Sequence, residues 1–354
     1  MTLSPGPLER LNRARADLRV GLPVVLTEGA QTALIAAAET LDDTRLGALR
    51  ALGQPVVALT ERRAATLKAR AYDGDLARIL VPADVDARWI EALADPAEDL
   101  THPMKGPMQS QREGSADLHR AAIRLVKSAQ LLPAALVVTG AAVPEGLTRL
   151  SIAETQAPET RLDPVIAARL PMRLAGVGRL HVFRPQDGGT EHYAVEIGKP
   201  LRDAPVLARL HSACFTGDVL GSLKCDCGPQ LHAALAAMQA QGAGVLLYLN
   251  QEGRGIGLAN KMRAYSLQDQ GFDTVEANHR LGFEDDERDF RLGAELLRKM
   301  GFSQVRLLTN NPRKVSMLES GGIDVVERVP LKVGLTDENA AYLATKAAKS
   351  GHLL

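Results

Sequence analysis

Hydrophobic and polar residues follow one another along the first 140 residues in a pattern that predicts strands separated by helices. Leu118, Ala122, Leu125 and Ala129 recur at helical spacing and share one face of a predicted helix. Residues 100–114 contain prolines and glycines without periodicity and predict a loop. The pattern predicts strands at 22–27, 54–60 and 131–140, and helices at 31–41 and 116–130.

The second half of the chain shows the same mixture of periodicities. The turn at 186–189 separates two runs of alternating apolar and polar residues, which is typical of paired strands. Gly242 follows a helical pattern as a stop signal, and Pro312 suits the first position of another helix. The pattern predicts strands at 179–185, 191–200, 205–214, 245–249 and 305–309, helices at 228–242 and 311–322, and a glycine-rich turn running into a helix at 251–271.

Length and element order together predict two domains. At 354 residues the chain is long for a single core. Prolines, charges and small residues from about Pro144 to Arg169 indicate a linker. We therefore expect an α/β (α+β) protein with domains at 1–165 and 166–354, each a mixed β-sheet with flanking helices.

Composition narrows the classes of function. Lysine plus arginine and aspartate plus glutamate both number 42, so the chain lacks the basic excess of a large nucleic-acid surface. Aromatic residues make up 3%, which argues against base-stacking platforms. The N-terminus lacks the apolar run of a secretory signal, and no stretch approaches eighteen apolar residues, so we expect no membrane contact. An odd number of clustered cysteines favours a reducing compartment, which predicts a cytoplasmic protein.

All three cysteines lie within fourteen residues, at Cys214, Cys225 and Cys227. Three thiols so concentrated indicate a zinc site with one open position, which is typical of catalytic zinc. Three ordinary buried cysteines are the alternative. His211 lies close by in sequence and fits either a fourth ligand, which would make the site structural, or a substrate contact.

Two turns could hold phosphate groups. The glycines of GRGIG leave backbone N–H groups available before a helix, and Arg254 and Lys261 add positive charge. In TNNPRK, Thr309 ends a strand while Arg313 and Lys314 open a helix, where cations oppose the helix dipole unless an anion binds. Solvated turns are the alternative for both.

The acidic run FEDDERDF also allows two interpretations. Asp285 or Asp286 could cap a helix, because acidic residues favour the first helical turn. One of these carboxylates could instead accept a proton during catalysis. The two interpretations are compatible.

Taken together, HSxCxTGD, SLxCDCG, QEGRxIGLxNKxRAYxLQDxGxDTVEAN, LGFxxDERDF and LLTNNPxK resemble GTP cyclohydrolase II, in order and at that family's spacing, from about residue 170 to 354. The resemblance implies the GTP cyclohydrolase II fold for the C-terminal domain, one Zn²⁺ per subunit, Mg²⁺ with the triphosphate, and a homodimer. It implies opening of the GTP imidazole ring at carbon 8. Formate and pyrophosphate leave, giving 2,5-diamino-6-hydroxy-4-(5-phosphoribosylamino)pyrimidine in the first step of riboflavin biosynthesis.

The family's functional residues transfer to matching positions of this sequence. The zinc ligands correspond to Cys214, Cys225 and Cys227, and the catalytic residues to Tyr265 near the reacting ring, Asp286 as proton acceptor and Arg288 as nucleophile on the α-phosphate. The GTP-binding residues correspond to Arg209, Leu210, His211, Ser212, Ala213, Gln230, Glu252, Gly253, Arg254, Thr274, Thr309 and Lys314.

Two positions complicate that transfer. Ala213 stands where the family commonly has glutamate, which could alter the surroundings of the metal. Arg288 is a difficult nucleophile, because a guanidinium stays protonated up to about pH 12. Either Asp286 takes its proton in a dry site or Arg288 is a phosphate clamp; the sequence leaves both open.

The N-terminal half is similar to 3,4-dihydroxy-2-butanone 4-phosphate synthase, which precedes the cyclohydrolase in many fused proteins. AAET at 37–40 and HRAAIRL followed by LLPAALVV carry the resemblance. That family binds magnesium through an acidic loop, where this chain offers one carboxylate, Glu28. Leu118 stands in place of a catalytic histidine, so we expect a catalytically silent domain in which Glu28 and His119 are surface residues.

Other functions remain compatible with the sequence. The N-terminal domain could be active, which would make the protein bifunctional. The chain could be a non-catalytic regulator that binds GTP and zinc, or it could convert GTP into a different product.

Overall fold

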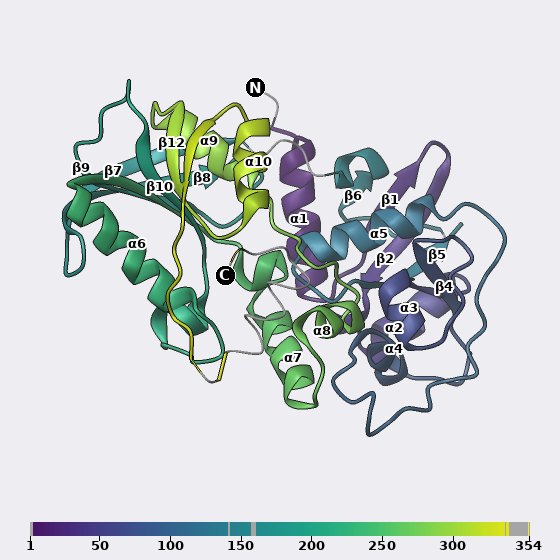
Figure 1. Ribbon diagram of the computed structural model, residues 1–354. Coiled ribbons are helices and arrows are strands. Elements are labelled where there is room, and N and C mark those ends of the chain that lie inside the picture. The colour runs from purple at the N-terminus through teal and green to yellow at the C-terminus, as the bar shows by residue number, and fades with distance from the viewer. Residues whose placement is uncertain (1–2, 141, 157–160, 337, 340–352, 354) are drawn as a thin grey trace. The chain divides into compact units, whose positions relative to one another are not determined.

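The computed structural model describes residues 3–140, 142–156, 161–336, 338–339 and 353. The chain forms two compact units (Figure 1). Unit 1 contains Met1–Glu159 together with Ala259–Asp286, and unit 2 contains Thr160–Leu258 and Glu287–Leu354. The prediction of an α/β protein with two mixed sheets is confirmed. The sequence did not predict that residues 259–286 would group with the N-terminal unit.

Unit 1 is built on a sheet whose strand order is β4-β3-β5-β2-β1-β6 among the described residues. β1 and β6 run parallel, and the other neighbours are antiparallel. The strands are β1 (Val24–Glu28), β2 (Gln31–Ala37), β3 (Val56–Thr60), β4 (Leu76–Leu80), β5 (Ala134–Thr139) and β6 (Arg149–Ser151). The helices are α1 (Pro7–Arg19), α2 (Asp43–Leu52), α3 (Glu61–Thr66), α4 (Ala87–Ala94), α5 (Asp117–Ser128), α7 (Leu258–Asp269) and α8 (Thr274–Arg280).

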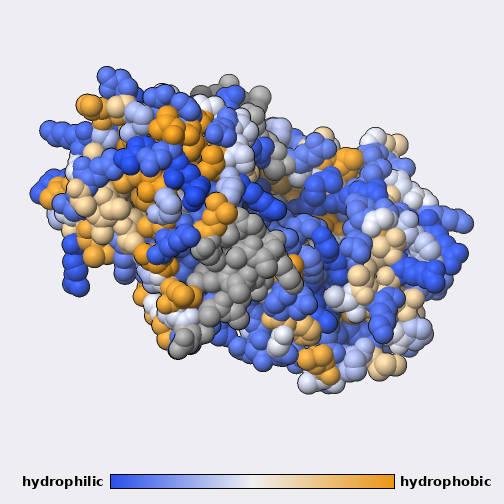
Figure 2. Space-filling view, viewed as in Figure 1, coloured by the Kyte–Doolittle hydropathy of each residue, from blue (hydrophilic) through white to orange (hydrophobic). Residues whose placement is uncertain are grey.

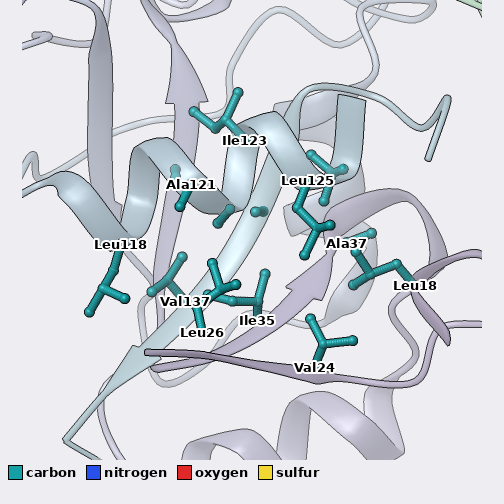
Figure 3. Packing of buried hydrophobic residues seen from close by; sticks show 14 of the residues in the cluster. Leu18, Val24, Leu26, Ile35, Ala37, Leu118, Ala121, Ile123, Leu125 and Val137 are labelled. Atoms are coloured by element: carbon teal, nitrogen blue, oxygen red, sulfur yellow. The ribbon is translucent and has the colours of Figure 1, made fainter. Parts of the chain in front are cut away.

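One hydrophobic cluster of unit 1 lies between α5 and the sheet. Leu118, Ala121 and Leu125 of α5 are buried together with Ile35 and Val137 of the strands (Figure 3). This agrees with the helical face that the sequence predicted, because a helix buries the stripe on which its apolar residues recur.

Unit 2 contains a sheet with the strand order β13-β12-β10-β11-β9-β8-β7 in the described residues. β13, β12, β10 and β11 run parallel to one another, and β9, β8 and β7 continue antiparallel. The strands are β7 (Leu162–Met172), β8 (Gly176–Pro185), β9 (His192–Gly198), β10 (Val206–Ser212), β11 (Ala243–Leu249), β12 (Gln304–Leu308) and β13 (Asp324–Val329). The helices are α6 (Cys227–Gln241), α9 (Arg291–Lys299) and α10 (Pro312–Ser320).

Two hydrophobic clusters form the core of unit 2. One contains residues of α9 and α10 with β10 to β12, and the other contains residues of α6 with β10 and β11. α6 ends at Gly242, which has a φ of 81°, as the predicted stop signal requires. The predicted hairpin of β8 and β9, the strands β10, β11 and β12, and the helices α6, α7 and α10 are confirmed.

The prediction of a helix at 31–41 is wrong. Most of this segment forms β2, which pairs with β1 on one side and β5 on the other. Its apolar residues fit a strand as well as a helix, and alanines favour the helix locally. Burial between two neighbouring strands outweighs that preference, as β-propensity depends strongly on position in a sheet.

Two further predictions are corrected. The predicted linker from Pro144 to Arg169 contains β6 and the first part of β7, which complete the edges of the two sheets; residues 157–160 of it lie outside the described residues. The acidic run does not cap a helix through Asp285 or Asp286. α9 begins at Arg291, and the side chain of Asp289 accepts a hydrogen bond from the Arg291 backbone.

His119 was predicted to be a surface residue, and it is buried instead, with 3% of its surface exposed. Neither ring nitrogen has a hydrogen-bond partner among the described residues. Burial lowers the pKa of His119 to about 4, and the charge of Arg78 adds to that effect. The histidine is therefore neutral near pH 7 and packs as an apolar group on the inner side of α5.

None of the helices in the described part of the chain has the length and apolar character that a membrane crossing needs. On the face shown in Figure 2, hydrophilic residues predominate and hydrophobic residues lie in separate patches. Val165, Ile166 and Leu170 are exposed on β7, the outer strand of its sheet.

The buried His119 predicts an acid-dependent loss of stability. Its pKa is about 4 in the folded chain and about 6.5 when unfolded, so the unfolded state binds more protons between these values. The free energy of unfolding should fall as the pH falls from 6.5 to 4, by on the order of 3 kcal/mol from this group. In His119→Leu this part of the pH dependence should disappear from denaturant unfolding curves. The control is His102→Ala, because the His102 side chain is 74% exposed; an equal change in both variants would contradict the assignment.

Candidate metal centre and nucleotide site

Most of the predicted functional residues of unit 2 lie where three parallel strands end. β10 lies between β11 and β12 and runs parallel to both. Ser212 ends β10, Leu249 ends β11 and Leu308 ends β12, so the three following loops leave the same edge of the sheet. In open α/β sheets this edge is the usual place for a ligand.

The loop after β10 brings the three cysteines together. Their sulfur atoms lie within 4.8 Å of one another, and the Cys214 and Cys225 Sγ atoms are 3.7 Å apart. Cys214 and Cys225 are each 5% exposed, and Cys227 is half-buried at the start of α6. The cluster that the sequence predicted is therefore confirmed as a group of close side chains.

A tight turn and one glycine make this approach possible. Residues Phe215–Val219 form a single π-helical turn directly after Cys214. A Cβ atom added at Gly217 would lie 2.7 Å from the Cys225 Sγ and 3.1 Å from the Cys214 Sγ. Real Cβ atoms do not approach sulfur so closely, so any larger residue at 217 would force the cysteines apart.

Asp218 holds the surroundings of the cluster in place. Its carboxylate accepts hydrogen bonds from the Cys214 backbone N–H at 3.0 Å and the Tyr248 hydroxyl at 2.9 Å. Both of its oxygens also lie 3.0 Å from the His211 Nε2 atom. Burial raises the pKa of Tyr248, and the negative charge of Asp218 adds to that rise, so the phenol stays protonated. Asp218 thus connects the loop after β10, which carries the cysteines and is called the metal loop below (residues 213–226), to β10 and β11.

The same contact defines the protonation of His211. A carboxylate only accepts hydrogen bonds, so Nε2 carries the proton and Nδ1 is a bare acceptor. Burial lowers the pKa of His211; the hydrogen bond to Asp218 opposes that shift, while the charges of Arg209 and Lys314 add to it. His211 Nδ1 is buried and has no partner among the described residues. His211 is absent from the group of close metal-ligating side chains, so its imidazole offers an acceptor beside that group.

The donor set of the cysteine cluster fits zinc. Two thiolates on one tetrahedral zinc, each at about 2.3 Å, lie about 3.8 Å apart, which matches the distance between the Cys214 and Cys225 sulfurs. Hydrogen bonds that favour its protonated thiol, formed with Cys214 and Cys225, raise the pKa of Cys227 well above its usual value, and burial and the negative charges of the neighbouring thiolates add to that rise. Three thiolates therefore need a cation between them, and soft sulfur ligands select metals such as zinc.

Two buried cations, Arg209 and Lys314, are held by hydrogen bonds near β10. Arg209 is 5% exposed and donates to the Leu308 carbonyl at 3.0 Å and to the Gln230 side chain, while burial lowers its pKa to about 10. Lys314 is 7% exposed and donates to the Leu210 carbonyl at 2.8 Å. These two predicted GTP contacts therefore also support the strands and helix on which the site is built.

Arg288 also contacts the end of β10. Its Nη1 atom donates to the Ser212 hydroxyl at 3.3 Å. The Arg288 guanidinium lies 4.7 Å from the centre of the Phe290 ring, and the Lys314 ammonium lies 5.3 Å from the same ring. Phe290, which the sequence analysis missed, holds both cations through its π-face.

The loop after β11 has an unusual backbone. Gly253 and Arg254 both adopt left-handed conformations, with φ values of 63° and 61°. Such a conformation is uncommon for a residue with a side chain and occurs mainly at functional sites. The Glu252 carboxylate accepts a hydrogen bond from the Phe215 backbone N–H at 2.6 Å, which links this loop to the metal loop.

The remaining predicted residues divide between the two units. Ala213 donates its backbone N–H to the Leu249 carbonyl at 2.7 Å, and Thr309 is buried, with its hydroxyl accepting from the Asn311 backbone at 3.0 Å. Tyr265, Thr274 and Asp286 belong to unit 1. The roles assigned to all these residues stay predictions.

Sequence reasoning missed the supporting partners of the site. Asp218 and Tyr248 lie in recognised patterns, yet nothing in their spacing showed that they would meet. Asp226 is 2% exposed and accepts a hydrogen bond from the Gln230 side chain. The one signal in the sequence that could have indicated these partners is that polar residues cluster where apolar strands end.

Comparison with known proteins identifies the family. The family model described as GTP cyclohydrolase II matches residues 163–330. A protein of Azospirillum brasilense named GTP cyclohydrolase-2 is 42% identical over 371 residues, which cover 100% of this chain and 96% of that protein. A GTP cyclohydrolase-2 of Azotobacter vinelandii is 58% identical over 190 residues, which cover 54% of this chain and 91% of that protein.

Among solved structures, RibBX, a two-domain 3,4-dihydroxy-2-butanone 4-phosphate synthase from A. baumannii, aligns with 90% of this chain and 100% of its own. The sequence identity is 17% and the TM-score 0.32, a value that does not establish a shared arrangement. The full-length similarity to the Azospirillum protein does carry a conclusion: the chain belongs to the GTP cyclohydrolase II family of hydrolases.

Proposed function

We propose that this protein is a zinc-dependent GTP cyclohydrolase II that converts GTP into 2,5-diamino-6-hydroxy-4-(5-phosphoribosylamino)pyrimidine, formate and pyrophosphate. The observation that carries the proposal is the cluster of Cys214, Cys225 and Cys227 in the loop after β10 and at the start of α6, in a chain of this family. Three thiols leave one position of a tetrahedral metal open, as in catalytic zinc sites.

The metal and the protein would share the chemistry. Zinc held by the three thiolates supplies a Lewis acid and lowers the pKa of a water molecule. The bare Nδ1 atom of His211 is suited to accept a hydrogen bond from an N–H group of the guanine base. Because three thiolates carry more negative charge than Zn²⁺ neutralises, a carboxylate would be needed to accept a proton, and we propose Asp286 for this role.

Phosphate recognition would rest on fixed cations. Arg288 and Lys314 share the ring of Phe290, and Arg209 keeps most of its positive charge near pH 7 even though burial lowers its pKa to about 10. Cations arranged before the substrate arrives stabilise developing charge without reorganisation. We propose Arg288 as the clamp on the α-phosphate, with Arg254 and a Mg²⁺ ion neutralising the rest of the triphosphate.

The remaining assignments extend the family resemblance. We propose Tyr265 next to the reacting ring and Thr274 as a GTP contact. We also propose a homodimer in the cytoplasm, where reduced thiols persist. For the N-terminal half we propose no second synthase reaction, and release of a four-carbon phosphate from ribulose 5-phosphate by the full chain would overturn that part.

The proposed reaction predicts a defined set of products. The full chain loaded with one zinc should release formate and pyrophosphate in equal amounts from GTP in the presence of Mg²⁺, because each GTP would lose one of each. The zinc would supply the acidified water for ring opening. A chelator should abolish the release, and added zinc should restore it. Chromatography with mass detection identifies the products. Absence of formate from the zinc-loaded chain would contradict the proposal, whereas formate without pyrophosphate would indicate a different GTP product.

The close approach at Gly217 predicts that zinc binding depends on this glycine. In Gly217→Ala the new Cβ would meet the Cys225 sulfur at 2.7 Å, so zinc affinity should fall about tenfold or more. Competition with a chromophoric chelator measures the affinity. The matched control is Gly47→Ala in α2, where an added Cβ meets no atom within 4 Å. Zinc affinity equal in both variants would show that the cluster does not hold the metal.

A further inference from the structure

The segment 259–286 is the unexpected feature of this chain. The range that matches the family model, residues 163–330, includes this segment, yet in the structure the segment groups with the N-terminal half. The Azotobacter relative uses 91% of its length to match 54% of this chain, so it has no room for a counterpart of residues 1–159. The N-terminal half must therefore provide this segment with contacts that a short relative lacks.

Arg263 of α7 makes the central contact. Its Nε donates to the Asp95 carboxylate at 2.8 Å, and its Nη2 donates to the Glu39 carboxylate at 3.0 Å. All three side chains are mostly buried, with exposures of 22% for Arg263, 16% for Glu39 and 21% for Asp95. Burial lowers the pKa of Arg263, but the two negative charges outweigh it and raise the pKa overall. A charge-assisted pair of this kind is stronger and more directional than an exposed ion pair.

The partners of Arg263 are themselves held. The second oxygen of Glu39 accepts from the Leu132 backbone N–H at 2.7 Å. Arg263 Nη1 donates to the Asn260 side chain at 2.8 Å, and Asn260 in turn donates to the Gln130 carbonyl at 3.1 Å. The first turns of α7 are thus bound to the rest of unit 1 through Asn260 and Arg263.

A second anchor lies at the other end of the segment. The Thr60 hydroxyl donates to the Gly282 carbonyl at 2.9 Å. A Cβ at Gly282 would meet the Thr60 Oγ1 at 2.7 Å and Pro133 at 2.9 Å, and Gly282 has a φ of 88°, so glycine is required there. Phe283 is 1% exposed, and α8 lies against α3 (Figure 1).

The two anchors lie close in sequence to the residues that the proposed function needs. Arg263 lies two positions before Tyr265, and Gly282 lies four positions before Asp286, with Thr274 between them. Glu39 and Asp95 lie outside the region that matches the family model. They can therefore be changed without altering the family's own motifs.

We infer that the N-terminal half acts in the cyclohydrolase reaction as a positioning element, in which Glu39 and Asp95 hold Arg263 and so fix the segment that carries Tyr265, Thr274 and Asp286. This inference rests on the proposed function. Glu39 and Asp95 are positioning residues, because they act on the substrate through Arg263. A small misplacement of reacting groups lowers the catalytic rate far more than it weakens binding.

The test uses the full zinc-loaded chain with Glu39→Gln and Asp95→Asn combined, which keeps the shapes and removes both charges. We expect kcat for formate release to fall about 10- to 100-fold, with the zinc content unchanged. The exchanged pair Glu39→Asp with Asp95→Glu restores both carboxylates and should recover most of kcat. The matched control is Arg62→Gln, because the Arg62–Glu284 pair joins the same two segments at 3.2 Å but is 40% and 60% exposed, and it should leave kcat unchanged.

Hydrogen exchange provides a readout that does not depend on turnover. Peptides from 259–286 should exchange faster in the neutralised variant, while peptides from α6 should match the unchanged protein. Wild-type kcat or wild-type exchange in the neutralised variant overturns the inference, and so does loss of zinc with faster exchange everywhere, which would indicate general destabilisation. If the unchanged zinc-loaded chain releases no formate, the proposed function fails. In that case the positioning role fails with it, whereas exchange still shows whether the two carboxylates anchor the segment.

Discussion

Three thiols within 4.8 Å of one another are the constraint on which the site depends. Their thiolate forms repel one another, and a metal cation bound between them would offset that repulsion. The chain brings them together with a single π-helical turn after β10 and with a glycine at 217, where no larger side chain fits. Asp218 then connects this loop to His211 and Tyr248. The strand, the turn and the carboxylate thus serve one purpose, which is to hold three sulfurs around one point.

The parallel arrangement of β11, β10 and β12 explains why distant motifs meet. Each strand ends at the same edge of the sheet, so loops that begin near residues 213, 250 and 309 become neighbours. Two of the cations at this edge are held by an aromatic ring, since both Arg288 and Lys314 make cation–π contacts with Phe290. A polyanion would therefore meet positive groups whose positions are already defined.

Local patterns in the sequence predicted most of the strands and helices of unit 2, because its apolar residues recur at periods that separate the two kinds of element. They failed at β2, where an alanine-rich run fits both periods and pairing with β1 and β5 decides. The motifs predicted the chemistry of the cysteines. They could not predict the partners of Asp218, which depend on strand register, nor the contact of Arg263 with Glu39, 224 positions away.

We propose a physical role for the N-terminal half, because residues 259–286 group with it in one compact unit. Its degenerate acidic loop suggested a silent relative of a synthase, and no periodicity linked it to the second half. The buried contacts of Arg263 and Gly282 show instead that residues 259–286 pack as part of this unit. A protein cut near residue 165 would leave those contacts unsatisfied.

The central claim is that Cys214, Cys225 and Cys227 hold a zinc ion with one position open, beside a histidine that is not a ligand. X-ray absorption at the zinc edge of the full chain tests it most directly. We predict three sulfur neighbours at about 2.3 Å and one light atom, without the multiple scattering of an imidazole ring. A shell with fewer than three sulfurs, or with the signature of a coordinated imidazole, would contradict it.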